Sequence, residues 1–168
     1  SAHTLSYLGR VLQALGDFTA AEAALRQSLD LAREMNYHFG SGLALDALGE
    51  LAYARGDYPQ ARSFFAESAA LFREMGDSHR LARTLNHQGM TALALTQPLE
   101  AQETFQAALT LALAGGLTPI ALSAAAGLAA LHVHTQGHPQ ALELVRFILR
   151  QPVVHPETRA LAERLQKE

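Results

Sequence analysis

Apolar residues recur along the chain at intervals of three and four, the spacing of one buried face of an α-helix. The pattern is clearest in two adjacent segments, at Leu45, Leu48, Leu51 and Ala52 and then at Ala61, Phe64, Phe65, Ser68 and Leu71. Extended over the chain, it predicts helices over residues 3–15, 18–36, 39–55, 58–75, 78–95, 98–114, 118–135, 139–150 and 156–167.

The pattern itself is an internal repeat, because Gly9 aligns with Gly49 and Gly89. Gly16-Asp17-Phe18 aligns with Gly56-Asp57-Tyr58, whereas a third copy has Thr96-Gln97-Pro98 at this turn and a fourth, weaker copy has Gly137-His138-Pro139. Each copy is predicted to be a helical hairpin, with repeats over about 2–37, 38–77, 78–117 and 118–151 in a single domain covering 1–168. Because the chain begins at Ser1 without an initiator Met, we expect it to be a piece of a longer protein.

The turns and the small residues indicate how each hairpin is built. Glycine at the end of a helix takes the left-handed conformation at little cost, and Asp17 or Asp57 then begins the second helix. We expect the small residues of the first helices to face alanines of the second helices and larger side chains to fill the next layer. These sets are Gly9, Gly49, Gly89 and Ala130, then Ala21, Ala61, Ala101 and Ala141, then Leu25, Phe65, Phe105 and Val145.

Composition supports an all-α protein and narrows its functions. The chain has 32 Ala and 29 Leu against 7 Val plus Ile, whereas a sheet favours β-branched residues. With 13 Lys plus Arg against 16 Asp plus Glu, it has no basic field for direct nucleic-acid binding. It has no cysteine, which excludes disulfides and thiolate chemistry and fits a cytoplasmic protein. The stretch 104–142 has no charged residue, but its Gly115-Gly116 loop signal argues against a membrane span.

Leu8-Gly9 and Leu48-Gly49 on the first helices, with Ala20-Ala21, Ala61 and Ala101 on the second, resemble the tetratricopeptide repeat. The usual unit of that family is about 34 residues, and the longer unit of this chain is similar to those of kinesin light chains and of sensor regions in bacterial signalling ATPases and ATP-dependent transcription activators. The segment 67–77 is similar to a helix end that recurs in those bacterial arrays. The resemblance implies an all-α, right-handed α-solenoid of about four hairpins, with 156–167 as a C-terminal capping helix.

The first helices of such an array line a concave groove, the default binding surface of the family. Carrying the family's 3-4-3 spacing onto this chain predicts inner-face residues that change from polar and charged to apolar along the array. The predicted groove residues are His3, Ser6, Arg10, Gln13, Leu43, Asp46, Glu50, Tyr53, Arg83, Asn86, Met90, Leu93, Ala124, Gly127, Leu131 and His134.

Two interpretations of this face remain open. It is a slot for a peptide or a helix, or Arg10, Asp46, Glu50 and Arg83 neutralise one another as exposed ion pairs. The uncharged stretch 104–142 likewise is an interface or a tightly packed part of the array, and its alanines favour packing.

No constellation of residues predicts a metal site, a cofactor or catalysis. His132, His134 and His138 lie close together in sequence, but positions two apart on a helix diverge and no carboxylate lies nearby. There is no Gly-x-Ser-x-Gly, no His-Glu-x-x-His and no phosphate-binding loop. Arg33, Glu34, Arg73 and Glu74 occupy matched positions typical of a solvated outer face.

The leading hypothesis is a non-catalytic module that binds a protein or peptide, as the sensor or scaffold part of a larger signalling or transcription-regulatory ATPase. A small-molecule effector sensor is the second hypothesis, motivated by Tyr53, Asn86, Arg83 and Glu50 in the middle of the groove. An oligomerisation scaffold that uses the uncharged face is the third.

Overall fold

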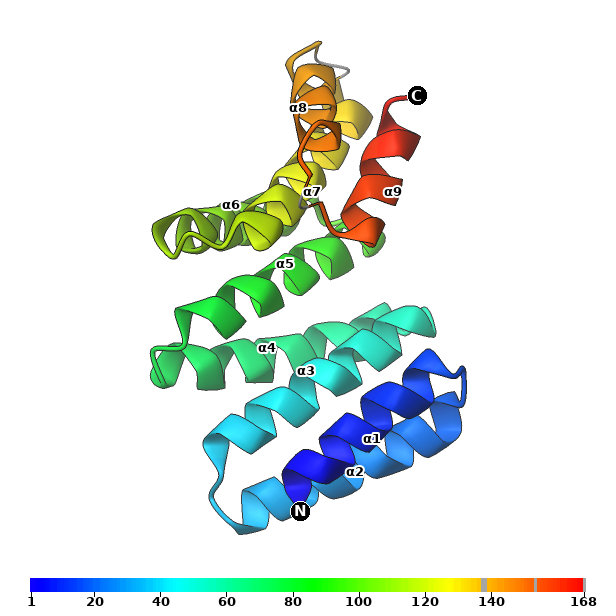
Figure 1. Cartoon of the computed structure of the whole chain (residues 1–168), viewed down its shortest axis with the longest axis vertical. Coiled ribbons are helices and arrows are strands. Elements are labelled where there is room, and N and C mark those ends of the chain that lie inside the picture. The colour runs from blue at the N-terminus through cyan, green and yellow to red at the C-terminus, as the bar shows by residue number, and fades with distance from the viewer. Residues whose placement is uncertain (137–138, 153, 168) are drawn as a thin grey trace. The chain divides into compact units, whose positions relative to one another are not determined.

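The computed structural model describes residues 1–136, 139–152 and 154–167, with side chains described for 1–132, 142–152 and 154–167. This part of the chain contains helices and no strands (Figure 1). The helices are α1 (Ala2–Ala14), α2 (Phe18–Glu34), α3 (His38–Ala54), α4 (Tyr58–Glu74), α5 (Ser78–Ala94), α6 (Pro98–Ala114), α7 (Thr118–Gln136), α8 (Pro139–Leu149) and α9 (Pro156–Leu165). Their bounds lie close to those predicted from apolar spacing, so the all-α prediction is confirmed.

The chain forms two compact units, residues 1–80 and 81–168. Unit 1 contains the antiparallel hairpins α1–α2 and α3–α4 and the first residues of α5 (Figure 1). Unit 2 contains the rest of α5 and helices α6 to α9, with α7 packed against α6, α8 and α9. None of the helices in the described part of the chain combines the length and apolar character that a membrane crossing needs.

Helices α1 to α6 are each followed by a left-handed residue that recurs at regular intervals, both within hairpins and between them. The positive backbone φ angles are at Gly16, Asn36, Gly56, Gly76, Thr96 and Gly116. After three of these turns an aspartate caps the next helix: Asp17 accepts from the Ala20 amide, Asp57 from the Gln60 amide and Asp77 from the Arg80 amide, at 3.0 to 3.1 Å. The predicted Gly-Asp helix boundaries are therefore confirmed.

Thr96 is strained, because it is a β-branched residue at φ 56° in a position where four of the other turns have glycine. We expect Thr96→Gly to raise the free energy of unfolding by about 1 kcal/mol, since the left-handed conformation costs a non-glycine residue about 1–2 kcal/mol. Urea denaturation of the full chain measures the change. Asn36→Gly is the matched comparison and should gain less, because asparagine tolerates this conformation; equal or lower stability of Thr96→Gly would contradict the interpretation.

In unit 1, close helix contacts depend on the glycines of the first helices. A Cβ atom on Gly9 would lie 2.5 Å from Leu25 Cγ, and one on Gly49 would lie 2.5 Å from Phe65 Cε1. Leu25, Phe65 and the facing Ala21 and Ala61 are all buried. The predicted layers of glycine, alanine and a bulky side chain are confirmed here.

Unit 2 uses the same device twice around one aromatic ring. Cβ atoms on Gly89 of α5 and Gly127 of α7 would both collide with the Phe105 ring, at 2.6 and 2.3 Å. The uncharged stretch that contains this ring is densely packed, with Ala108, Ala112 and Ala126 fully buried. These contacts favour the packing interpretation of residues 104–142.

Candidate functional site

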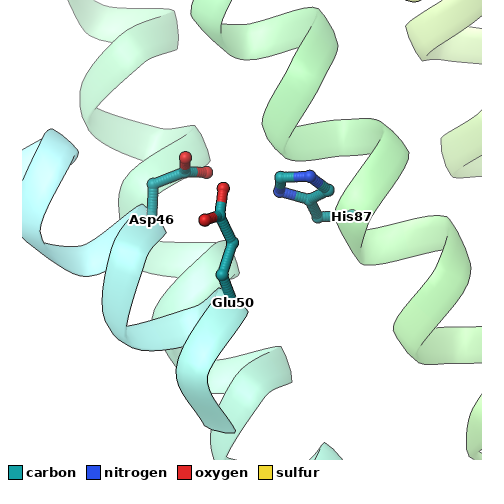
Figure 2. Close-up of side chains that lie close together, drawn as sticks. All are labelled: Asp46, Glu50 and His87. Carbon is teal, nitrogen blue, oxygen red and sulfur yellow. The ribbon is translucent and has the colours of Figure 1, made fainter. Parts of the chain in front are cut away.

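The predicted groove residues of unit 1 include an ion pair between its two hairpins. Arg10 Nη2 of α1 lies 3.1 Å from Glu50 Oε2 of α3, with both side chains partly accessible to solvent. Asp46 is one turn before Glu50 on the same helix, and Figure 2, which also draws His87 of α5, shows both carboxyl groups projecting from α3. The interpretation that Arg10 and Glu50 neutralise each other is therefore supported, and such exposed pairs contribute about 0–1 kcal/mol to stability.

Two residues that we expected on the exposed inner face of unit 1 are buried. Ser6 shares a 2.8 Å hydrogen bond with the Ser28 hydroxyl of α2, and Ser28 also donates to the Ala2 carbonyl at 2.6 Å. Ser6 therefore faces the partner helix of its own hairpin, and its assignment to the groove is wrong. Asp46 is fully buried on α3, which packs against α1, α2 and α4, so the expectation that it is exposed is also wrong.

Tyr53 and Gln13 are half-buried at the end of this surface. The Tyr53 ring meets Tyr58 edge to face, with 5.3 Å between the ring centroids, and packs against the cluster formed by Ala52, Ala61 and Phe65. The accessible part of the predicted surface in unit 1 is mainly polar, and it consists of His3, Arg10, Gln13, Leu43, Glu50 and Tyr53.

The second helices of unit 1 have their own ion pairs. Glu22 of α2 lies 2.8 Å from the Arg26 guanidinium and also pairs with Arg55. The hydrogen bond from Arg55, and to a smaller extent the one from Arg26, hold the pKa of Glu22 below its ordinary value. Arg33 pairs with Glu67 of α4, and both are exposed. This matches the solvated outer face that the sequence predicted around Arg33 and Glu34.

In unit 2, three predicted groove residues line one cavity. Arg83, Asn86 and Met90 of α5, with His87, form one wall of a cavity of about 230 Å³. Ile120 and Ser123 of α7 form the second wall, and Thr158 and Leu161 of α9 form the third. The remaining lining residues are Pro119, His155 and Glu157.

Two polar side chains of this lining, Asn86 and Ser123, are linked by a hydrogen bond. Asn86 Nδ2 donates to Ser123 Oγ at 2.8 Å, which joins α5 to α7. Asn86 is only 7% exposed, contrary to our expectation of an exposed groove residue. Its amide oxygen has no hydrogen-bond partner among the residues described here, and leaving a buried acceptor unpaired costs about 1–3 kcal/mol.

The predicted groove positions of the fourth hairpin are displaced by one position. The predicted spacing puts this hairpin one position too far from the third. In the structure α7 follows α5 at the same interval as α5 follows α3, with starts at His38, Ser78 and Thr118. The extra length lies instead at the end of α7, so Ser123, and not Ala124, corresponds to Arg83. The expectation that Ala124 and Leu131 are exposed is wrong, since both are buried.

Two further predicted residues lie away from the cavity or outside the described side chains. Leu93 is half-buried and packs against the cluster of α7, α8 and α9 side chains that includes Ala126 and Val145. The side chain of His134 is outside the described residues, as is His138. His132 Nδ1 lies 2.7 Å from the Leu128 carbonyl oxygen.

The contribution of α9 to the cavity was missed. The sequence predicted only a C-terminal capping helix over 156–167. Ala162 and Leu165 do cover the end of the core, but Thr158 and Leu161 lie beside the predicted groove residues of α5. The sequence did contain a signal for this contact. Leu161 lies next to Ala162 and one turn before Leu165, so the helix has one more apolar residue beside the two that are buried at the end of the core.

The repeats, the turn chemistry and the helix contacts agree with a match to a known family. Residues 1–74 match the family model described as tetratricopeptide repeat. A tetratricopeptide repeat array is therefore supported over these residues. Such repeats generally mediate protein–protein interaction or scaffolding, and the fold is typically a non-catalytic binding scaffold.

Solved structures extend the likeness to almost the whole chain. A crystal structure of a Podosopora anserina putative kinesin light chain with nearly identical tetratricopeptide-like repeats is 17% identical, with a TM-score of 0.73. A crystal structure of a variant of that protein has the same identity and a TM-score of 0.74. Both alignments cover 98% of this chain and 82% of the other. The all-α repeat solenoid class is thereby confirmed, and no curated protein matches this sequence.

Proposed function

We propose that this tetratricopeptide repeat array is a non-catalytic module that binds a protein or peptide along the inner faces of α1, α3, α5 and α7. The observation that carries the proposal is the cavity of unit 2. Arg83, Asn86 and Met90, which the repeat pattern assigns to the inner face, line this cavity together. Concave, mostly apolar sites with a few polar groups are where proteins bind ligands.

The two units offer different chemistry to such a partner. The surface of unit 1 is polar, with Arg10, Glu50 and Tyr53 accessible, whereas the cavity of unit 2 has apolar walls at Met90, Ile120 and Leu161. An apolar anchor in the cavity supplies binding energy, and polar contacts elsewhere supply orientation. A partner with an apolar anchor fits the cavity of unit 2, and a polar segment fits the surface of unit 1.

We further propose that the array is the sensor or scaffold part of a larger signalling or transcription-regulatory ATPase in the cytoplasm. The support is the similarity of residues 67–77 to the helix ends of such arrays. The test is the full reading frame that encodes this chain. A Gly-x-x-x-x-Gly-Lys-Ser/Thr motif within it would support the proposal, and a frame without any ATPase motif would contradict it.

The binding proposal predicts that changes in the cavity remove the partner while the fold survives. Arg83→Glu and Met90→Lys should each weaken binding by about 1–3 kcal/mol, or about 5- to 150-fold in Kd, because a buried contact is lost and a charge is misplaced. Affinity capture from the cells that express the chain, with quantitative mass spectrometry, measures retention of the partner. Melting temperatures of all variants establish that the fold is intact.

The matched controls are Arg146→Glu and Leu99→Lys, which make the same chemical changes at exposed positions of the second helices. They should retain the partner. If the controls lose the partner and the cavity variants keep it, binding is on the outer helices and the proposal is wrong. If all variants retain their partners and mass spectrometry recovers a bound metabolite, the small-molecule sensor is the better hypothesis.

A further inference from the structure

The cavity of unit 2 has the size and the polarity of a site for one small group. Its volume of about 230 Å³ is below the roughly 300–1,000 Å³ of sites for drug-sized ligands. Met90, Ile120 and Leu161 provide apolar walls, and the Asn86–Ser123 pair provides a polar floor that joins α5 to α7. A single side chain with an apolar stem and a polar end matches this arrangement.

The Asn86–Ser123 pair leaves one acceptor and one donor unused in the described structure. The Asn86 amide donates to Ser123 Oγ, so its own oxygen remains as an acceptor, and this oxygen is buried without a partner among the described residues. Ser123 uses its oxygen as the acceptor and keeps its hydroxyl hydrogen as a donor. If the Asn86 amide is rotated by 180°, its oxygen accepts from the Ser123 hydroxyl. The pair then presents an N–H donor on Asn86 and an acceptor oxygen on Ser123.

We infer that this cavity binds a primary carboxamide, supplied by an Asn or Gln side chain of the partner. A carboxamide carries an N–H donor for the Asn86 oxygen and a carbonyl acceptor for the Ser123 hydroxyl, and the methylene groups of Gln would pack on Met90, Ile120 and Leu161. The inference rests on the proposed function and adds the chemical class of the group that enters the cavity.

Other ligand classes satisfy only part of the site. A carboxylate has acceptors alone, so one of its oxygens would face the Asn86 oxygen, although Arg83, His87 and His155 also line the cavity. An ammonium group has donors alone, and it would lie near the Arg83 charge with only Glu157 as a carboxylate in the lining. An alkyl group would leave the amide oxygen unpaired. Among a carboxylate, an ammonium group, an alkyl group and a carboxamide, the carboxamide alone pairs with both members of the Asn86–Ser123 floor.

Three probes of similar size separate these classes: butyramide, butyrate and 2-pentanone. Each is titrated into the full chain, and the methyl resonances of Met90, Ile120 and Leu161 are followed by NMR. Butyramide should shift them saturably, with a Kd on the order of millimolar, as expected for a ligand of about six heavy atoms. Butyrate and 2-pentanone should bind at least about tenfold more weakly, since each lacks the N–H donor.

Substitutions in the polar floor test the assigned contacts. Asn86→Leu keeps the side-chain volume and Ser123→Ala is a mild change in a helix, and each should weaken butyramide binding at least about tenfold. Gln106→Leu, at an exposed position of α6 outside the lining, should leave it unchanged. Ser123→Ala keeps the test decisive if Asn86→Leu does not fold.

Peptides then distinguish a partner's side chain from a free amide. Acetyl-Gly-Gln-Gly-N-methylamide, in which the Gln side chain is the single primary carboxamide, should shift the same resonances more strongly than the Glu and Met peptides with the same caps. Tightest binding by butyrate, equal binding by all probes, or no binding by butyramide would overturn the inference. Binding of butyramide without binding of the Gln peptide would overturn the assignment to a partner's side chain. Each of these failures is distinguishable from failure of the proposed function, which depends only on whether Arg83→Glu and Met90→Lys lose the partner.

Discussion

Phe105→Ala is expected to lower the free energy of unfolding by about 3–5 kcal/mol, the range for removing a fully buried phenylalanine ring. The Phe105 side chain is 0% exposed, and its ring lies against the backbone of both Gly89 on α5 and Gly127 on α7. Glycine has no side chain that can move into the space the ring leaves. The cavity should therefore remain largely unfilled, which places the loss at the upper part of the range.

Urea denaturation followed by circular dichroism measures this loss. Leu99→Ala is the matched control, because Leu99 is on the same helix but 77% exposed, and it should change stability by less than about 0.5 kcal/mol. A loss below about 1 kcal/mol for Phe105→Ala would show that the ring does not hold α5 and α7 to α6. Such a result would also remove the structural basis for the cavity between α5, α7 and α9.

The parts of this structure that follow from short-range chemistry could be predicted from sequence. The Gly-Asp turns depend on neighbours within one hairpin, as do the contacts of Gly9, Gly49 and Gly89 with Leu25, Phe65 and Phe105, and the internal repeat shows these features more than once. Helix bounds follow because a turn is marked by glycine and the next helix by aspartate or proline. Thr96 has the same left-handed conformation although it is not glycine, and its position in the repeat is the one feature of the sequence that indicates this conformation.

The candidate site was harder to predict because exposure depends on rotation about the helix axis. The family spacing placed Ser6 on the open face of α1, yet its hydroxyl binds Ser28 on α2. An error of one position in aligning the fourth hairpin moved the prediction from Ser123 to Ala124, which exchanges a cavity residue for a buried one. The role of Thr158 and Leu161 depends on how the last helix folds back, which no local pattern specifies.

Gly49→Leu is expected to destabilise the chain by more than about 2 kcal/mol, because it forces a bulky side chain into a helix contact without free space. A Cβ atom alone would lie 2.5 Å from Phe65 Cε1 and 2.7 Å from Phe65 Cδ1, well inside van der Waals contact. Phe65 is 1% exposed and has no room to withdraw. The better helix propensity of leucine, about 1 kcal/mol over glycine, offsets only part of this cost.

The measurement is again urea denaturation of the full chain, with Ala66→Leu as the control at an exposed position of α4. The control should change stability by less than about 0.5 kcal/mol, and a similarly small change for Gly49→Leu would mean that Gly49 is not at the helix crossing. The double variant Gly49→Leu with Phe65→Ala tests the cause. If the clash is with the Phe65 ring, shortening that ring makes room for the leucine, so the double variant should lose less than the sum of the two single losses. Additive losses would mean that the strain is in the α3 backbone itself and does not come from contact with Phe65 of α4.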